Sequence, residues 1–352
     1  MAANKGKAQV LMSRLAKNPL PRWRGFNLLE KFTAKKSSKS ATLASANPPF
    51  QESDFQWISD WGFDFVRLPM SYHCWSSPEQ WLDMDEFVLS HLDEAIEMGR
   101  RHGVHVCLNL HRAPGYCVNP PGEPKSLWRN AEALEACCHH WRVFAKRYAG
   151  ISSAQLSFDL LNEPPAPCDA MTRAEHEQVI RALVGAIREC DKTRLIIADG
   201  LSWGNEPIPE LADLGIAQSC RAYLPMGISH YKAPWVGGEK FPPPQWPMGD
   251  NFGQKWNRAS LEEHYGKWAQ LMERGIGVHC GEGGCFNETP HAVFLSWFRD
   301  VLEILRDLGI GFALWNFRGS FGVLDSGRKD AEYKDWHGHR LDVNLLKLLQ
   351  KL

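Results

Sequence analysis

Short apolar runs alternate with longer amphipathic stretches along most of the chain. Short apolar or β-branched runs are typical of strands, and apolar residues three and four positions apart are typical of helices. The pattern predicts eight strand–helix pairs. The predicted strands are 24–28, 63–68, 104–110, 155–161, 194–198, 226–230, 277–281 and 311–316. The predicted helices are 52–61, 85–101, 131–148, 172–190, 207–214, 260–274, 290–308 and 342–352.

Repeated strand–helix pairs predict an α/β protein with a parallel sheet, and eight pairs are the number that closes a (β/α)8 TIM barrel. An open doubly wound sheet has a similar pattern. It is less favoured because no glycine-rich phosphate turn follows the first predicted strand at Leu28. We therefore expect residues 1–352 to form a single TIM-barrel domain, with residues 1–20 as an N-terminal extension.

Two glutamates stand where a barrel places its chemistry. Glu163 follows the fourth predicted strand in Asn162-Glu163-Pro164, and Glu282 follows the seventh in Gly281-Glu282-Gly283. Strand C-terminal ends converge on one mouth of a TIM barrel, and the fourth and seventh strands lie nearly opposite each other. Two carboxyl groups across a cleft are what glycoside cleavage needs, one protonated to help the leaving oxygen and one ionised.

Other polar and aromatic residues are predicted at the same mouth. Arg67 lies on the second predicted strand, His111 follows the third, and His230 ends the sixth. A carboxylate near an arginine is pushed towards its charged form, and one facing apolar walls towards its neutral form. The predicted site can therefore hold one ionised and one protonated carboxyl group.

Charge and aromatic content narrow the class of partner. The 40 lysines and arginines nearly balance the 41 aspartates and glutamates, so nothing indicates nucleic acid or a membrane surface. The chain has 15 tryptophans, and flat aromatic faces stack on sugar rings without needing charge. Several are predicted in strand-to-helix connections, where each can equally fill a small core of its own loop. These are Trp75, Trp128, Trp203, Trp235, Trp246 and Trp256.

The N-terminus has no apolar run of signal-peptide type, so we expect a cytoplasmic chain as written, or a secreted one if a leader was removed. The ten cysteines lack the spacing of a disulfide scaffold and are expected to be reduced and mostly buried. The run Cys137-Cys138-His139-His140 falls on a predicted helix, where neighbouring side chains point to different faces. We therefore expect neither a metal nor a cofactor.

The ordered set of motifs resembles the cellulase-type enzymes of glycoside hydrolase family five from about Arg24 to the C-terminus. The motifs are Asn162-Glu163-Pro164, Gly281-Glu282-Gly283-Gly284, Arg67 in Val-Arg-Leu-Pro, His111 in Leu-Asn-Leu-His, His230, and Trp315 in Leu-Trp-Asn. The resemblance implies a TIM barrel that hydrolyses β-linked glycans with retention of anomeric configuration, through a covalent glycosyl-enzyme.

The same resemblance implies roles for single residues. Glu163 would be the acid/base and Glu282 the nucleophile. Arg67 would keep Glu282 ionised, His111 and Asn162 would bind sugar hydroxyls at the cleavage subsite, and Trp315 would form its floor. Members of the family usually place a tyrosine two residues after the histidine of the sixth strand. The order here is His230-Tyr231-Lys232, which puts the tyrosine that contacts the nucleophile in doubt.

The segment His111-Arg-Ala-Pro-Gly-Tyr-Cys-Val-Asn119 resembles the third-strand loop of glucan-cleaving relatives. We therefore expect a monomeric endo-β-glucanase that acts on a β-linked oligo- or polysaccharide. Alternatives are a β-mannanase or an exo-acting β-glucosidase on the same fold, a carbohydrate-binding barrel without hydrolysis, and a metal-dependent hydrolase.

Overall fold

The computed structural model describes residues 17–32 and 48–352, so most of the predicted extension at residues 1–20 lies outside the described residues. The protein has the closed (β/α)8 barrel that the pattern predicts. Its parallel strands are β1 (Arg24–Asn27), β2 (Phe65–Ser71), β3 (His105–Ala113), β5 (Leu156–Asp159), β6 (Leu195–Asp199), β7 (Ala217–Ala222), β10 (Val278–Gly283) and β11 (Gly311–Leu314).

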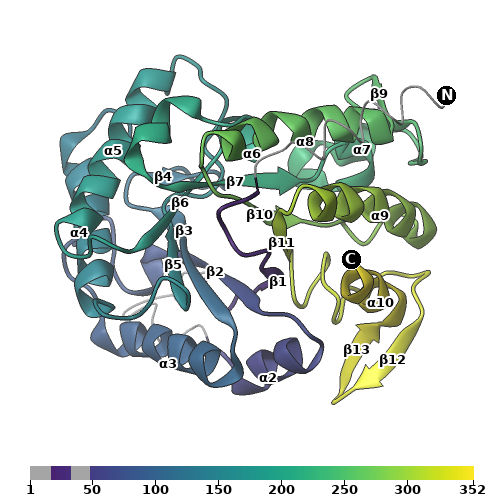
Figure 1. Ribbon diagram of the computed structural model, residues 1–352, viewed down its shortest axis with the longest axis horizontal. Helices are drawn as coiled ribbons and strands as arrows, with labels where there is room; N and C mark the ends of the chain where they lie inside the picture. Colours follow the sequence, from purple (N-terminus) through teal and green to yellow (C-terminus); the bar gives the residue numbers. More distant parts are fainter. Residues whose placement is uncertain (1–16, 33–47) are drawn as a thin grey trace. The chain divides into compact units, whose positions relative to one another are not determined.

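The chain divides into two compact units. The continuous unit is Leu28–Ser219, and the composite unit joins Met1–Asn27 to Cys220–Leu352. The expectation of one domain over residues 1–352 stays a prediction. Figure 1 shows the continuous unit in blue to teal.

In the continuous unit, parallel strands pair in the order β2, β3, β5, β6 and the beginning of β7. Phe65 of β2 is paired with His105 of β3, and Ile197 of β6 is paired with Ala217 of β7. All residues of β2 and β3 are buried, as expected of parallel strands covered on both faces. A short β4 (Tyr116–Cys117) pairs antiparallel with the end of β3.

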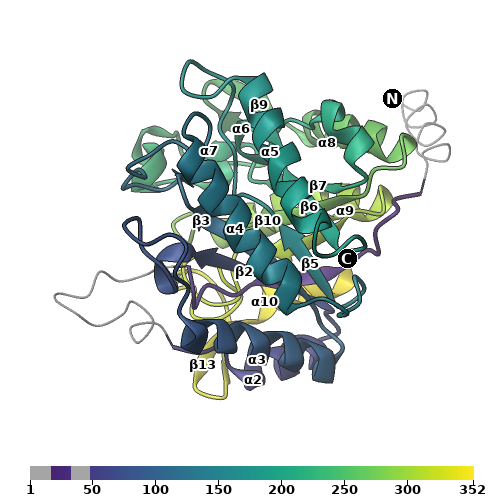
Figure 2. The ribbon, with the colours of Figure 1, turned by 90° about the vertical axis from the view of Figure 1, so that its left-hand side faces the viewer.

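Four amphipathic helices cover these strands, and Figure 2 shows α4 and α5 side by side in front of them, with α3 below. The helices are α2 (Glu52–Asp60), α3 (Glu86–His102), α4 (Ala131–Arg147) and α5 (Arg173–Arg188). Side chains cap three of their N-termini: Asp85 caps α3, Asn130 caps α4, and Thr172 forms a capping box with Glu175 on α5. The helices predicted at 52–61, 85–101, 131–148 and 172–190 agree with these four to within two residues at each end.

In the composite unit, β11 pairs in parallel with β1 and β10. The helices are α8 (Arg258–Glu273), α9 (His291–Asp307) and α10 (Val343–Lys351). Two antiparallel hairpins are added, β8 (Gly249–Asn251) with β9 (Gln254–Trp256), and β12 (Tyr333–Trp336) with β13 (His339–Asp342). Asn18 joins the start of the chain to this unit, because its amide donates to the carbonyl oxygens of Val278 and Gly309.

The predicted sixth strand at 226–230 is wrong. Those residues form the short helix α7 (Met226–Ser229), which Pro225 precedes and in which the His230 N–H donates to the Met226 carbonyl at 2.9 Å. The sixth barrel strand is β7, nine residues earlier, where Gln218, Ser219 and Arg221 are buried polar residues. An apolar-run criterion misses such a strand because it requires apolar side chains in the core.

The predicted helix at 207–214 is a 3-10 helix, η3 (Pro209–Leu214). Other short helical turns are η2 (Tyr72–Cys74), α6 (Leu201–Gly204), η4 (Pro234–Val236) and η5 (Gly238–Lys240). Among residues 17–32 and 48–352, no helix is long and apolar enough to cross a membrane.

Seven of the ten cysteines are buried, which agrees with the expectation that most of them are. The exceptions are Cys168, which is exposed, and Cys117 and Cys190, which are half-buried.

Candidate active site

Glu163 lies four residues beyond the end of β5 and has a left-handed backbone, with φ 51°. Its N–H donates to Oδ2 of Asp199 at 2.9 Å, and its carbonyl accepts the hydroxyl of Tyr116 at 2.7 Å. A non-glycine residue in this region costs about 1–3 kcal/mol and persists where its surroundings enforce it. Two hydrogen bonds on opposite sides of one residue supply that enforcement, so the position of Glu163 is strongly specified.

Arg67 organises the residues next to Glu163. Its Nε is 2.7 Å from Oδ2 of Asp159, and its Nη2 donates to Oδ1 of Asn162 at 2.8 Å. A further carboxylate, that of Asp199, lies 3.7 Å from Nη2. Because the Arg67 side chain is buried, its charge requires such partners. The arginine thus fixes the amide of Asn162 directly before Glu163.

His111 and Asn162 also lie together. Nδ2 of Asn162 is 3.4 Å from Nε2 of His111, and both residues are buried. The ring of Phe32 meets the imidazole edge-on, with centroids 3.9 Å apart. The continuous unit therefore assembles three of the predicted binding residues, Arg67, His111 and Asn162, around the segment that carries Glu163.

Glu282 lies on β10, and only 3% of its surface is exposed. The hydroxyl of Tyr223 donates to its Oε2 at 3.0 Å, and Nη2 of Arg221 lies 3.4 Å from its Oε1. Different groups therefore contact the two oxygens of the carboxylate. Neither Arg221 nor Tyr223 was predicted, because the strand that carries them was placed at 226–230. A polar strand end, Arg221-Ala222-Tyr223, followed by Pro225, was the available signal.

Gly283 allows this arrangement through a close approach of neighbouring strands. A Cβ atom at Gly283 would stand 2.6 Å from the Cβ of Ala222, which is closer than two carbon atoms of different residues can lie. Ala222 lies between Arg221 and Tyr223. A glycine after Glu282 therefore lets the end of β10 lie against the end of β7.

His230 follows α7 rather than a strand, and its imidazole packs edge-on against Tyr223 with centroids 5.1 Å apart. Its Nδ1 is 2.8 Å from the hydroxyl of Ser229, which itself donates to the Tyr223 carbonyl. Burial lowers the pKa of His230 to about 4, so the ring is neutral near pH 7. Tyr231 is half-buried, with the Lys232 ammonium 5.2 Å from its ring centroid.

The aromatic residues predicted to bind sugar differ in exposure. Trp203 and Trp235 are 47% and 57% exposed, whereas Trp128 and Trp315 are half-buried. Trp235 packs against Phe286 with ring centroids 5.0 Å apart. Trp75 takes the other role that the sequence left open for the loop tryptophans, because its side chain is 2% exposed and its Nε1 donates to His140.

The cysteine and histidine run on α4 has structural partners. Cys137 is buried, and the His140 ring contacts Trp75 at Nδ1 and the Trp81 carbonyl at Nε2. Across the part of the chain that the structure describes, no group of three or more His, Cys, Asp and Glu side chains is arranged to hold a metal ion.

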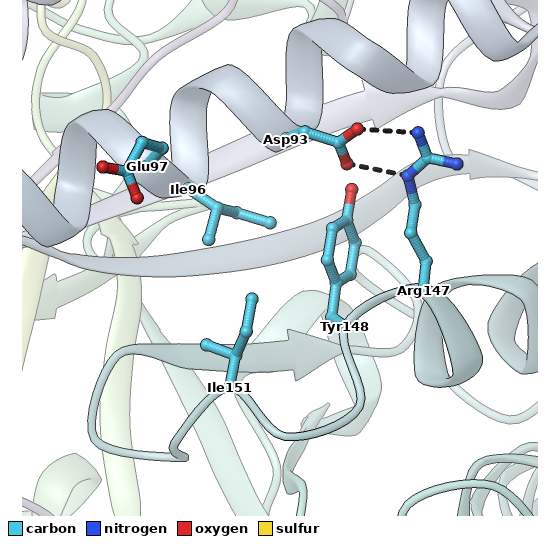
Figure 3. A pocket seen from close by; sticks show the side chains of 6 residues that line it. All are labelled: Asp93, Ile96, Glu97, Arg147, Tyr148 and Ile151. Carbon is cyan, nitrogen blue, oxygen red and sulfur yellow. Dashed lines mark hydrogen bonds and ion pairs between the residues drawn. The ribbon is translucent and has the colours of Figure 1, made fainter.

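A pocket of about 390 Å³ lies on the helix side of the continuous unit, lined by Asp93, Ile96, Glu97, Arg147, Tyr148 and Ile151 (Figure 3). Arg147 donates to both oxygens of Asp93, at 2.7 and 2.6 Å. Asp93 and Arg147 are therefore used in an ion pair with each other and Glu97 in one with Arg100, and none of the lining residues follows a barrel strand.

Comparisons with known proteins agree on one family. The family model described as Cellulase (glycosyl hydrolase family 5) matches residues 29–320. Endoglucanase C of Acetivibrio thermocellus is 26% identical over 305 residues, which cover 79% of this chain and 87% of that protein. Cellodextrinase A of Ruminococcus flavefaciens is 26% identical over 270 residues, which cover 74% of this chain and 76% of that protein. A crystal structure of a glycoside hydrolase superposes with a TM-score of 0.88 at 38% identity, covering 94% of this chain and 99% of that one.

Proposed function

Because the chain belongs to the cellulase family, glycosyl hydrolase family 5, and is therefore a glycoside hydrolase, we propose that it is an endo-acting β-glucanase that retains anomeric configuration. The observation that carries the proposal is the environment of Glu282, a nearly buried carboxylate contacted by a guanidinium and a tyrosine hydroxyl. A carboxylate whose two oxygens face a guanidinium and a hydroxyl donor is suited to attack a sugar carbon rather than to donate a proton.

In this mechanism, the carboxylic acid of Glu163 protonates the glycosidic oxygen while the Glu282 carboxylate attacks the anomeric carbon. The bond to the leaving sugar breaks, and a glycosyl ester forms on Glu282. The Glu163 carboxylate then takes a proton from water, the water oxygen attacks the anomeric carbon, and the ester bond breaks to restore Glu282. The proposal requires the two carboxyl groups to lie about 5–5.5 Å apart when substrate is bound.

The other predicted site residues take supporting roles. Arg67 positions Asn162, and His111 and Asn162 bind hydroxyls of the sugar at the cleavage point. The neutral imidazole of His230 packs beside Tyr223 and is available to contact sugar. Tyr231 directly follows His230 in the chain. Four tryptophans supply flat faces for sugar rings, namely Trp128, Trp203, Trp235 and Trp315.

β-Glucan is favoured over β-mannan as the substrate. Two relatives that match about three quarters of this chain are named as an endoglucanase and a cellodextrinase. Those names concern glucan chains and their fragments, and the carbohydrate is neutral, in keeping with the near-zero net charge of this chain.

The test compares wild-type protein with Glu163→Gln and Glu282→Gln on soluble β-glucans, β-mannan and aryl β-glucosides. Each substitution keeps the size of the side chain and should lower turnover by roughly 100-fold or more. Glu97→Gln, on the exposed face of α3, is the matched control and should keep wild-type turnover.

Product analysis separates the alternatives within the proposal. An endo-acting enzyme lowers viscosity quickly and releases oligosaccharides of mixed length, whereas an exo-acting one releases a single short sugar. Azide should partly rescue Glu282→Ala and give a product of inverted configuration. Sugar binding without any release of reducing ends, or near-wild-type turnover in either glutamate variant, would overturn the proposed function.

A further inference from the structure

Arg221 is a buried charge on the strand next to Glu282. Its side chain is fully buried, and its Nη2 lies 3.4 Å from Oε1 of Glu282. Its Nη1 also donates to the Cys220 carbonyl at 3.3 Å. A guanidinium stays protonated throughout the pH range in which proteins are folded, so this positive charge is permanent.

Arg221 and Tyr223 are two residues apart at the end of β7, so their side chains point to the same side of the chain. Tyr223 donates to Oε2 of Glu282, and Arg221 faces Oε1. One contact is between a neutral hydroxyl and the carboxylate, and the other is between two full charges. The two residues therefore respond differently to a change in the charge of Glu282.

The proposed reaction changes that charge twice. Glu282 is an anion in the free enzyme, a neutral ester in the glycosyl-enzyme, and an anion again after water has attacked. A fixed cation close to the carboxyl group favours the two anionic states over the ester, because the attraction between opposite charges is strong in a site that excludes water. The charge of Arg221 therefore acts mainly on the second step.

We propose that Arg221 is a positioning residue that drives release of the sugar from Glu282, by stabilising the carboxylate as the ester bond breaks. The inference rests on the proposed function. In the step concerned, water adds to the anomeric carbon, its proton passes to Glu163, and the electron pair of the broken C–O bond returns to Glu282. Arg221 touches neither sugar nor water in this role and acts through Glu282.

The test uses Arg221→Met, which removes the charge while keeping much of the side-chain volume, and Arg221→Lys, which keeps a positive charge. With an aryl β-glucoside that has a good leaving group, the first step is fast and the second limits turnover. For Arg221→Met we expect kcat and KM to fall together by roughly 10-fold or more, the loss typical of a charge-assisted contact. The value of kcat/KM should change much less.

Two direct readouts follow the intermediate. A limiting second step gives a burst of one aryl alcohol per enzyme in the wild type as well, so the readouts are the rate after the burst and the lifetime of the adduct. In Arg221→Met the rate after the burst should be roughly 10-fold slower than in the wild type, and the glycosyl group seen by intact mass should persist correspondingly longer once the substrate is used up. Arg221→Lys should restore most of kcat and shorten the lifetime of the adduct. Arg221→Gln is a second neutral replacement and should behave like Arg221→Met, so the test survives if the methionine variant does not fold.

Arg194→Met is the matched control. Arg194 is also a fully buried arginine, but it donates to the carbonyls of Leu156 and Tyr148 and pairs with Asp191. Its loss should lower the melting temperature without a shared fall of kcat and KM and without a longer-lived adduct.

A merely structural role for Arg221 predicts that its neutral variants behave like Arg194→Met, with lower stability and an adduct lifetime equal to that of the wild type, and that result would overturn the inference. Wild-type protein that does not hydrolyse β-glucosides would instead contradict the proposed function, as would a Glu282→Gln variant that remains active. The two failures are therefore distinct.

Discussion

The carboxylate of Glu282 shows how single residues define this site. Its neighbours Arg221 and Tyr223 come from β7 and the residue after it, and neither was found from the sequence. Tyr231, which directly follows His230, was the tyrosine that the sequence offered. The hydroxyl that reaches Glu282 belongs to Tyr223, eight residues earlier. A contact across two strands cannot be found from residue spacing when one of the strands has been placed wrongly.

Replacing Tyr223 by phenylalanine removes one hydroxyl from the Glu282 carboxylate. Hydrogen bonds to charged groups contribute about 1.5–3 kcal/mol, so kcat/KM on a β-glucan should fall by roughly 10- to 100-fold.

Tyr231→Phe, measured in parallel, decides between the two tyrosines. We expect its loss of kcat/KM to be several-fold smaller than that of Tyr223→Phe. A larger loss in Tyr231→Phe would restore the interpretation from sequence, in which Tyr231 serves the nucleophile.

At the scale of elements, the sequence predicted those whose local pattern agrees with their place in the fold. Helix α5 has a capping box at Thr172 and Glu175 and a regular apolar face, and its prediction was accurate. The strand β7 has three buried polar residues, Gln218, Ser219 and Arg221, and the side chains of Gln218 and Arg221 have partners elsewhere in the sequence. The Gln218 amide, for example, exchanges hydrogen bonds with both backbone groups of Ile208. A strand with buried polar residues therefore cannot be recognised from apolar runs, because the groups that satisfy those residues lie elsewhere in the sequence.

The connection between β10 and α9, which follows Glu282, has one arginine bonded to three of its carbonyls. The buried guanidinium of Arg328 donates to the carbonyls of Thr289, Cys285 and Phe286, and it lies over the ring of Phe294. These carbonyls lose their charged donor if the side chain is shortened or made apolar. An unsatisfied buried carbonyl costs about 1–3 kcal/mol.

Arg328→Met should therefore lower the free energy of unfolding by roughly 2–4 kcal/mol, as measured by urea denaturation. Lys329→Met is the matched control, because the neighbouring Lys329 side chain is 85% exposed and its ion pair with Glu288 is long, at 3.7 Å. Its unfolding free energy should stay within about 0.5 kcal/mol of wild type. Equal effects of the two substitutions would show that Arg328 does not hold this connection.

At the scale of the whole molecule, buried histidines occur in both compact units. Burial is the main cause that lowers the pKa of each to about 4. They are His105, His140, His176, His230 and His264. In the unfolded chain a histidine takes up its proton near pH 6.5, so between pH 6.5 and 4 the unfolded state binds more protons. The stability that these neutral rings contribute is complete above pH 6.5 and is lost as the pH falls towards 4.

We therefore expect the melting temperature, measured by scanning calorimetry, to fall steadily between pH 7 and pH 4.5. The variant His176→Leu should show a shallower fall, because His176 is fully buried and neither of its ring nitrogens has a hydrogen-bond partner in the described structure. Each unit by which a pKa is displaced corresponds to about 1.4 kcal/mol. A pH-independent melting temperature in wild type, or an unchanged slope in the variant, would contradict this account.

The fold as a whole was predicted correctly although one strand was misplaced. The prediction of a barrel remained correct because it depends on the number and order of the strands and helices more than on the boundaries of any one of them. Roles at the mouth depend instead on distances between residues far apart in sequence, for which a single chain offers no local signal.

The composite unit is built from the two ends of the chain, and this has a consequence for how the protein is made. Strand β1 is synthesised almost three hundred residues before its partner β11. The carbonyl groups of Val278 and Gly309, which accept from the Asn18 amide, are also synthesised long after Asn18. The unbroken stretch Leu28–Ser219 is finished much earlier. Folding during synthesis should thus begin in the continuous unit, and β1 should pair with β11 only after that unit has formed.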